Sequence, residues 1–287
     1  MATYPTMTDE YRNGPPSRLP ADVSLPVLMY HEIVSEPLIK SSLFKMTSSY
    51  YLSAYAFEEQ MKSLFEQGYR SIGFDEVDRL DPDGRYVIIT FDDGLIGNAK
   101  YALPILKKYG FKAIFYVVAG AIDSPRYMSW IDLKELIASG MSIQSHTMSH
   151  RSLLTLSEQE IEWELNESKD CLERRLQVPV TSLSFPHGHH NQMTIRMAYR
   201  CGYRVLCTSE VICNNAASFR NTPVVLGRIN VNGGMSTKTF IKLVGYDTRA
   251  ILMEIFAKGS KNLVKRVIGI NNYGKIYSWL FNIKSRQ

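Results

Sequence analysis

The ten residues RYVIITFDDG, from Arg85 to Gly94, decide the fold class of this 287-residue chain. Most of the first seven are apolar, many are β-branched, and Asp-Gly pairs bound these seven on both sides, a pattern typical of a buried strand. Two adjacent acids, Asp92 and Asp93, follow where the strand ends. Barrels of parallel strands carry their chemistry at that end of each strand. The stretch therefore predicts a buried strand that ends in two carboxylates. These carboxylates either belong to a site or, because Asp-Gly is also common turn chemistry, form an ordinary turn.

Strands and helices alternate on both sides of this stretch. Short apolar runs predict strands over residues 26–34, 85–91, 111–118, 141–145, 181–185, 203–208 and 224–231. Helical periodicity fills the intervals, over 57–67, 97–109, 131–139, 157–176 and the region after His190. The long helix begins with Ser157 as its N-cap and Glu160 three residues later, which is a capping box. Repeated βα units indicate an α/β protein with a parallel sheet, and about seven such units suggest a closed barrel.

The two ends of the chain differ in composition from this central region. Residues 1–24 are polar and proline-rich and are expected to form a flexible lead-in, ahead of a barrel over 25–235. A basic helical extension is expected over 236–287. Its last part carries seven bases and no acid, which suits peripheral contact with anionic membrane headgroups, although a solvated helix end explains it equally well.

Composition narrows the class of protein and its surroundings. A hydrophobic fraction of 45% is ordinary for a globular chain, and neither a secretory signal pattern nor a membrane-spanning stretch is visible. The four cysteines form no metal or redox motif and are interpreted as reduced packing residues. We therefore expect a cytoplasmic protein, at most associated with the inner membrane face. Nucleic acid is not expected as a partner, because the excess of basic residues is confined to the tail and no recognition motif accompanies it.

The segment SHTMSH places His146 and His150 four residues apart, directly after a predicted strand. This spacing allows two imidazoles to bind one metal ion, and zinc accepts such nitrogen-rich sites. Surface or capping roles are the alternative for an isolated pair. A carboxylate at the end of an earlier strand would complete a set of two histidines and one acid that leaves positions open for water and substrate.

A third segment, SFPHGHHNQ from Ser184 to Gln192, runs from a strand into a proline-glycine turn. Such a turn can point backbone N–H groups at the oxyanion formed in acyl transfer, although an ordinary turn would look the same. Its three histidines, His187, His189 and His190, are unusual in one turn, and one of them could titrate near neutral pH.

Read together, TFDDG, SHTMSH and FPHG resemble the motifs of the polysaccharide deacetylases of carbohydrate esterase family 4, the NodB homology family. The resemblance covers roughly residues 26–233, and VLMYHEI and LGRINV are similar to members of exopolysaccharide pathways. It implies a distorted parallel (β/α)7 barrel. It also implies Asp92 as general base, Asp93, His146 and His150 as metal ligands, and the His187 backbone N–H as a donor to the acetyl oxygen.

Two positions depart from the family pattern. The third motif normally opens with an arginine that holds the catalytic aspartate, and Ser184 stands there instead. The last motif normally carries a histidine that acts as the acid, and Arg228 occupies that region. Because arginine stays charged, it cannot be that acid. We therefore hypothesise that Arg228 holds Asp92 and that His189 or His190 protonates the leaving amine.

These residues predict a metal-dependent N-deacetylase that acts on an N-acetylated sugar or polysaccharide precursor. One divalent ion is expected, zinc first, although cobalt, nickel, manganese or iron also suit such ligands. An amidase or O-deacetylase of the same superfamily is an alternative, as is a catalytically weak sugar-binding protein of a polysaccharide assembly pathway. His31 is either a pocket residue or a core histidine, and Trp130 is expected to pack rather than to stack on sugar.

Overall fold

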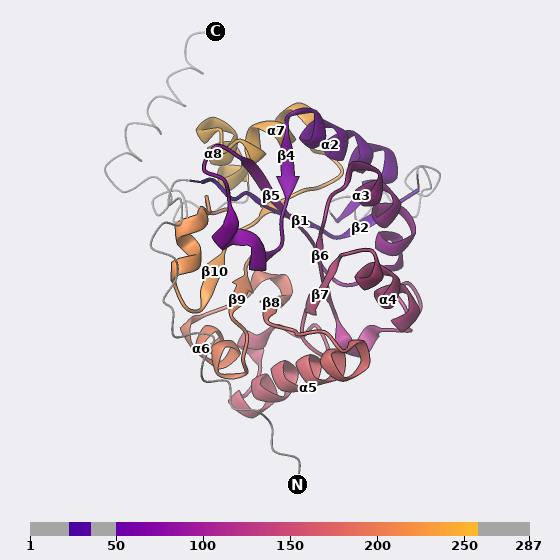
Figure 1. Ribbon diagram of the computed structural model, residues 1–287. Coiled ribbons are helices and arrows are strands. Elements are labelled where there is room, and N and C mark those ends of the chain that lie inside the picture. Colours follow the sequence, from indigo (N-terminus) through magenta and orange to yellow (C-terminus); the bar gives the residue numbers. More distant parts are fainter. Residues whose placement is uncertain (1–22, 36–49, 258–287) are drawn as a thin grey trace, which may run out of the picture.

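The computed structural model describes residues 23–35 and 50–257 (Figure 1). Most of the expected lead-in and the basic tail from residue 258 onward lie outside the described residues, so the expectations for them stay predictions. Within the described ranges, no helix is long and apolar enough to cross a membrane.

Strands and helices alternate along the described chain, as the sequence predicts. The strands are β1 (Val27–Tyr30), β2 (Glu32–Val34), β3 (Tyr51–Ser53), β4 (Tyr69–Ser71), β5 (Arg85–Phe91), β6 (Ile114–Val117), β7 (Ser142–Ser145), β8 (Ser182–Ser184), β9 (Val205–Cys207), β10 (Val224–Leu226) and β11 (Ile229–Asn230). The α-helices are α2 (Ala54–Glu66), α3 (Leu103–Tyr109), α4 (Trp130–Ala138), α5 (Glu158–Leu176), α6 (Gln192–Arg200), α7 (Thr237–Val244) and α8 (Thr248–Ala257).

The main sheet closes into a distorted barrel through one bent segment. Its strands pair in the order β10-β9-β8-β7-β6-β5-β1-β11, all in parallel, and β4 pairs with β5. Only Gly227 and Arg228 separate β10 from β11, so these two strands are halves of one bent barrel strand. This strand pairs with β9 through β10 and with β1 through β11. With β10 and β11 counted as one strand, the barrel has seven strands, and the predicted (β/α)7 class is confirmed.

The bend between β10 and β11 depends on a glycine. A Cβ at Gly227 would clash with the backbone of Glu210 and with Ile212, so a larger residue would push the loop after β9 away. The Asn214 side chain holds the same point from both directions, since Nδ2 donates to the Gly227 carbonyl at 2.8 Å and Oδ1 accepts from its N–H at 3.1 Å. The sequence predicted one unbroken strand here, and this close packing is why it breaks.

Successive side chains of each strand point to opposite faces of the sheet, so the hydrophobic core forms two layers. Leu28, Ile89 and Phe115 point outward and pack under the helices, whereas Val27, Ile88 and Ile114 point into the barrel. On β5 the inward face continues from Ile88 through Thr90 to Asp92, because every second residue of a strand shares a face. The barrel interior is thus apolar at the amino ends of the strands and polar at their carboxyl ends.

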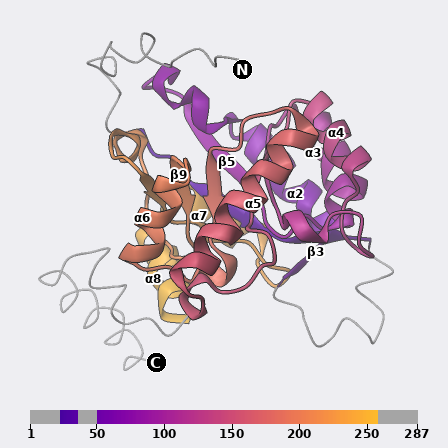
Figure 2. The same cartoon turned by 90° about the horizontal axis from the view of Figure 1, so that it is seen from below.

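The helices form an outer layer around the strands (Figures 1 and 2). Neighbouring helices contact one another in two series, α8-α7-α2-α3 and α4-α5-α6. Phe240, Leu243 and Val244 of α7 are buried in the outer core, so α7 occupies a place in this layer beside α2. The capping box predicted at Ser157 and Glu160 is present at the start of α5.

Three local predictions differ from the structure. The strand expected over 26–34 breaks at His31. The second part, β2, pairs separately with β3, which lies in a stretch where no strand was predicted. The helix expected over 97–109 begins with a π-helical turn over Asn98–Ala102. The first break leaves His31 in the wall of the cavity described below, and in the π-helical turn the Asn98 side chain accepts from the Ile33 N–H of β2.

Candidate active site

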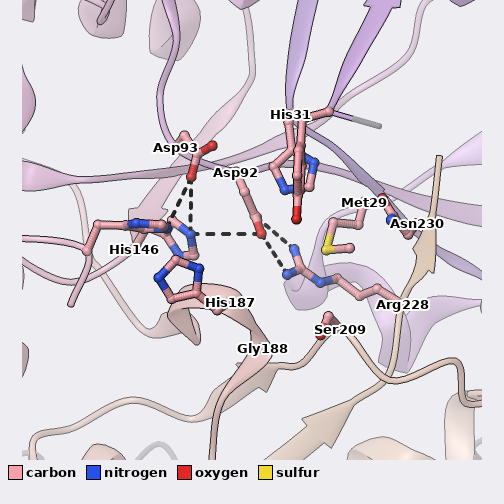
Figure 3. Close-up of a pocket in the computed structure, with 12 residues that line it drawn as sticks. Met29, His31, Asp92, Asp93, His146, His187, Gly188, Ser209, Arg228 and Asn230 are labelled. Carbon is pink, nitrogen blue, oxygen red and sulfur yellow. Dashed lines mark hydrogen bonds and ion pairs between the residues drawn. The ribbon is translucent and has the colours of Figure 1, made fainter. Parts of the chain in front are cut away.

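A cavity of about 420 Å³ lies at the carboxyl ends of the barrel strands (Figure 3). Parallel barrels use this end for function because the loops that follow the strands converge there. The lining residues are Met29, His31, Tyr50, Asp92, Asp93, His146, His150, His187, Gly188, Ser209, Arg228 and Asn230. Most of the residues predicted from the sequence therefore meet in one pocket.

Asp93, His146 and His150 form a group of donors suited to one metal ion. One ligand atom from each lies within 4.8 Å of the others. Asp93 Oδ1 is 3.5 Å from His146 Nε2 and 3.4 Å from His150 Nε2. Donors held about 2.0–2.2 Å from a tetrahedral zinc ion stand roughly 3.3–3.5 Å apart, so the spacing fits. Two imidazoles and a carboxylate also suit iron, manganese, cobalt and nickel.

Hydrogen bonds from the surrounding structure hold the two histidines in place. The Nδ1 atom of His146 lies 2.8 Å from the Ser184 carbonyl, which accepts its proton and leaves Nε2 facing Asp93. Glu164 of α5 is buried and accepts from the backbone N–H groups of Met148 and Ser149, both at 2.9 Å. The Glu164 carboxylate thus fixes the loop between the histidines.

Three residues of the site adopt left-handed backbone conformations. The φ angle is 71° at Asp93, 60° at His150 and 59° at His187. Such angles are uncommon for residues other than glycine and persist only where the surroundings enforce them. In each case the conformation follows the end of a strand and aims the residue at the cavity. The local strain is consistent with a functional constraint on these loops.

Asp92 and Arg228 form a buried ion pair inside the barrel. Arg228 is 1% exposed, and its Nη1 and Nη2 atoms each lie 2.7 Å from a different oxygen of Asp92. Its remaining N–H groups donate to Thr90 Oγ1, to Ser184 Oγ and to the Thr208 carbonyl. All five guanidinium donors are therefore used, which holds the side chain in a single position. The contact hypothesised between Arg228 and Asp92 is present.

The electrostatic surroundings shift the pKa values of Asp92, His146 and His150 in different directions. Burial disfavours the charged form of Asp92, but Arg228 and His146 outweigh it and hold the pKa of that carboxyl well below its usual range. Burial likewise opposes the charge on His146, yet Asp92 and Asp93 raise its pKa. Burial and the neighbouring His146 lower the pKa of His150 to about 4. Asp92 is thus an anion at neutral pH, whereas the His150 ring is neutral.

The three histidines of the turn after β8 occupy different positions. His187 lines the cavity, and its ring centroid is 4.7 Å from that of His150. His189 and His190 are not among the lining residues. Ser152 Oγ lies 3.1 Å from His189 Nδ1, and His190 stacks on Phe185 with its Nδ1 atom 2.9 Å from the Gly188 carbonyl. Their role as acids stays a prediction.

His31 lies in the cavity, which answers the open question about it. Its ring makes an edge contact with Tyr50, and burial lowers its pKa although Asp92 and Asp93 act in the opposite direction. Trp130 packs against the outer core, with the Arg175 guanidinium 5.0 Å from its ring centroid.

Sequence reasoning missed four lining residues: Met29, Tyr50, Ser209 and Asn230. For Met29 and Asn230 a signal exists, because they lie two residues from His31 and Arg228 and so share the inward face of their strands. Ser209 likewise lies two residues after the inward-facing Cys207. Nothing in the sequence marks Tyr50.

Removing one donor of the cluster should abolish tight metal binding. Outer-shell partners of metal ligands are typically worth 10–100-fold in affinity. We therefore expect His150→Ala to weaken zinc binding by at least about 100-fold. Calorimetric titration of metal-free protein measures this, and His189→Ala, outside the cavity, should bind as the parent does. Parent-like affinity in His150→Ala would remove His150 from the ligand set.

Comparison with known proteins places these features among characterised families. A family model described as polysaccharide deacetylase matches residues 79–206. The Bacillus subtilis protein YxkH, whose name assigns it to the polysaccharide deacetylases, is 33% identical over 221 residues, which are 75% of this chain and 74% of YxkH. A poly-β-1,6-N-acetyl-D-glucosamine N-deacetylase of Staphylococcus aureus is 24% identical over 67% of this chain and 74% of its own.

A solved structure shows the same architecture. The Streptococcus pyogenes deacetylase PplD, in complex with acetate, superposes with a TM-score of 0.70 at 29% identity. The match covers 77% of this chain and 98% of that one.

Proposed function

The chain belongs to the polysaccharide deacetylase family, and from this premise we propose that it is a metal-dependent hydrolase that removes the acetyl group from an N-acetylated sugar. Polymers or precursors of N-acetylglucosamine are the substrates that we favour. The Staphylococcus aureus relative is named for such a polymer, and PplD was solved with acetate, the expected product.

One observation carries the proposal. The Asp93, His146 and His150 donors meet in the same cavity as an ionised Asp92 that is not needed to complete the donor group. A binding protein has no need for a proton acceptor that stands beside a metal site without belonging to its donor group. Hydrolysis needs both.

Hydrolysis of the amide assigns a role to each group. A divalent ion held by the three donors would supply polarisation of the acetyl carbonyl and would make a water molecule more acidic. Asp92 accepts a proton as that water attacks the carbonyl carbon. His187 lies in the first turn of a 3₁₀ segment, where backbone N–H groups have no partner within the turn, so its N–H can donate to the developing oxyanion. The C–N bond then breaks to release acetate and the amine.

The leaving nitrogen requires a proton, and we propose that His31 supplies it. His31 lines the cavity, whereas His189 and His190 do not. Figure 3 shows its ring beside Asp92, across the cavity from the turn that carries His187 and Gly188. Burial lowers the pKa of the His31 ring on balance, and the nearby Asp92 and Asp93 carboxylates oppose that shift.

Replacing His31 with glutamine should lower kcat for acetate release by roughly 100-fold, the usual contribution of a proton donor. Steady-state kinetics measure the loss. The double variant His189→Ala with His190→Ala should keep most of the parent activity. If the double variant fails and His31→Gln remains active, the proton comes from the turn after β8 instead.

The proposed reaction is tested with a panel of substrates. N-acetylglucosamine oligomers of β-1,6 and β-1,4 linkage, O-acetylated sugars and simple acetamides are incubated with zinc-loaded protein, and acetate is quantified. We expect release from at least one N-acetyl sugar. Release from esters or non-sugar amides alone would replace the proposal by O-deacetylase or amidase activity. Binding of the sugars without any release would favour a sugar-binding protein.

A further inference from the structure

Four of the six histidines in the chain form a continuous series of ring contacts. The ring centroid of His150 is 4.8 Å from that of His146 and 4.7 Å from that of His187. The series then continues to His189, whose ring centroid is 5.6 Å from that of His187. His146 and His150 belong to the metal donor group. The proposed reaction uses only the backbone of His187 and nothing of His189, so these two side chains still lack a role.

The exposure of the side chains increases along this series. The His146 side chain is 2% exposed and the His150 side chain is 31% exposed, whereas His187 and His189 are exposed residues. Figure 3 shows the His187 ring at the same end of the cavity as His146, opposite Arg228. The series therefore leads from a buried metal donor to the surface of the protein.

Neighbouring rings in the series are close enough to bind one ion together. Imidazole nitrogens held about 2.0–2.1 Å from a zinc ion place the centroids of two such rings roughly 5 Å apart. His150 stands almost as far from His187 as from His146, its partner in the donor group. The gap between His187 and His189 is slightly wider, but exposed side chains change rotamer on the picosecond to nanosecond timescale and can close it.

The turn that carries the two outer histidines is fixed in position. A Cβ at Gly188 would clash with the Ser209 side chain, so glycine allows the turn to pack closely against the loop after β9. The Gly188 N–H also donates to the Phe185 carbonyl at 2.8 Å. Ser152 Oγ lies 3.1 Å from His189 Nδ1. In the tautomer whose Nδ1 donates to that hydroxyl, the lone pair that can bind a metal lies on Nε2.

A partly buried metal site needs an entry path. A hydrated ion must exchange its water molecules for protein ligands before it reaches a donor as buried as His146. An imidazole that replaces one water at the surface keeps the ion next to the site while the remaining exchanges occur. His187 and His189 stand where such an exchange begins, and His150 is adjacent to both the outer histidines and the buried donor.

We propose that His189 and His187 form a capture path, which binds a zinc ion at the surface and passes it through His150 to the donor group. The inference rests on the metal dependence of the proposed function and goes beyond it, because it concerns how the site is loaded. The side chains of the path bind the ion only in passage. Because the same path serves entry and release, its loss slows both by the same factor and leaves the equilibrium affinity unchanged.

Stopped-flow measurements of zinc uptake and release test the capture path. Metal-free protein is mixed with zinc in the presence of a fluorescent zinc indicator, which gives the association rate constant. Zinc-loaded protein is mixed with a chelator, at concentrations where the rate no longer depends on the chelator, which gives the dissociation rate constant. Neither readout requires acetate release.

The variants are His187→Asn, His189→Gln and the two combined. Asparagine suits position 187, because it tolerates the left-handed backbone found there. His190→Gln is the matched control, since it removes a histidine of the same turn whose ring stacks on Phe185 and is not part of the series.

The double variant should show association and dissociation rate constants that are each at least about 10-fold lower than those of the parent, because the ion is no longer held at high effective concentration beside the donor group. Its Kd should equal that of the parent, in contrast to the weaker binding expected of His150→Ala. His190→Gln should behave as the parent does. His187→Cys should recover much of the rate lost in His187→Asn, because a thiolate also binds zinc.

Parent-like rate constants in the double variant would overturn the capture path. A higher Kd caused by faster release would also overturn it, because the outer histidines would then be ligands of the bound ion. A parent that takes up no zinc would overturn the metal dependence of the proposed function itself, so the two failures are distinguishable.

Discussion

Asp92→Asn should reduce acetate release by at least about 100-fold while the protein still binds metal, because a general base contributes roughly 10²–10⁴-fold to such reactions. The amide cannot take a proton from the attacking water. Asp92 is not part of the donor group of Asp93, His146 and His150, so the affinity for zinc should persist. Metal content per chain and steady-state kinetics, measured on the same preparation, check both parts.

Asp93→Asn is the matched control, because it makes the same change one residue later. It should lose metal affinity together with activity, since Asp93 Oδ1 stands within 3.5 Å of both histidine nitrogens. An Asp92→Asn enzyme that keeps more than half of the parent rate would exclude Asp92 as the base. If both variants lose zinc equally, the two aspartates do not divide the roles.

Arg228→Met should destabilise the protein by about 3–5 kcal/mol, because it leaves the Asp92 carboxylate buried without its partner. Three further hydrogen bonds, to Thr90, Ser184 and Thr208, are lost with the guanidinium. Without Arg228 the pKa of Asp92 rises, and the site loses the anion that accepts the proton. The free energy of unfolding in denaturant and the rate of acetate release measure the two effects.

Two further variants keep this prediction testable. Arg228→Lys retains the charge but not the planar five-donor geometry, so we expect a loss of roughly 1–3 kcal/mol and clearly lower activity. Arg174→Met removes an exposed arginine that lies 3.5 Å from Glu167, and it should cost at most about 1 kcal/mol. If Arg228→Lys leaves turnover untouched, Arg228 does not position Asp92.

The fold was largely predictable because strand periodicity and helix caps are local signals. The strand ending at Phe91 and the capping box at Ser157 follow from neighbouring residues alone. The bend at Gly227 does not, since it depends on Glu210 and Ile212, which reach that point only when the barrel closes. The short β3 strand is specified by its pairing with β2 rather than by its own composition.

The site residues likewise fall into those that the sequence predicted and those that only the structure revealed. Asp92, Asp93, His146 and His150 stand in motifs at strand ends, so the topology brings them together. Glu164 was not foreseen, because its target is the backbone of a loop about fifteen residues earlier, and an acid inside a long helix has no distinctive spacing. Asn230 is recognisable only once the inward face of β11 is known.

The most direct test is acetate release from β-1,6-linked N-acetylglucosamine oligomers by protein that has been stripped of metal and then reloaded with zinc in steps. The structure predicts no release from stripped protein and a rate that rises in proportion to zinc until one ion per chain is bound. Undiminished release from stripped protein, or a fully loaded protein that releases no acetate from any N-acetyl sugar, would contradict the proposed metal-dependent deacetylase.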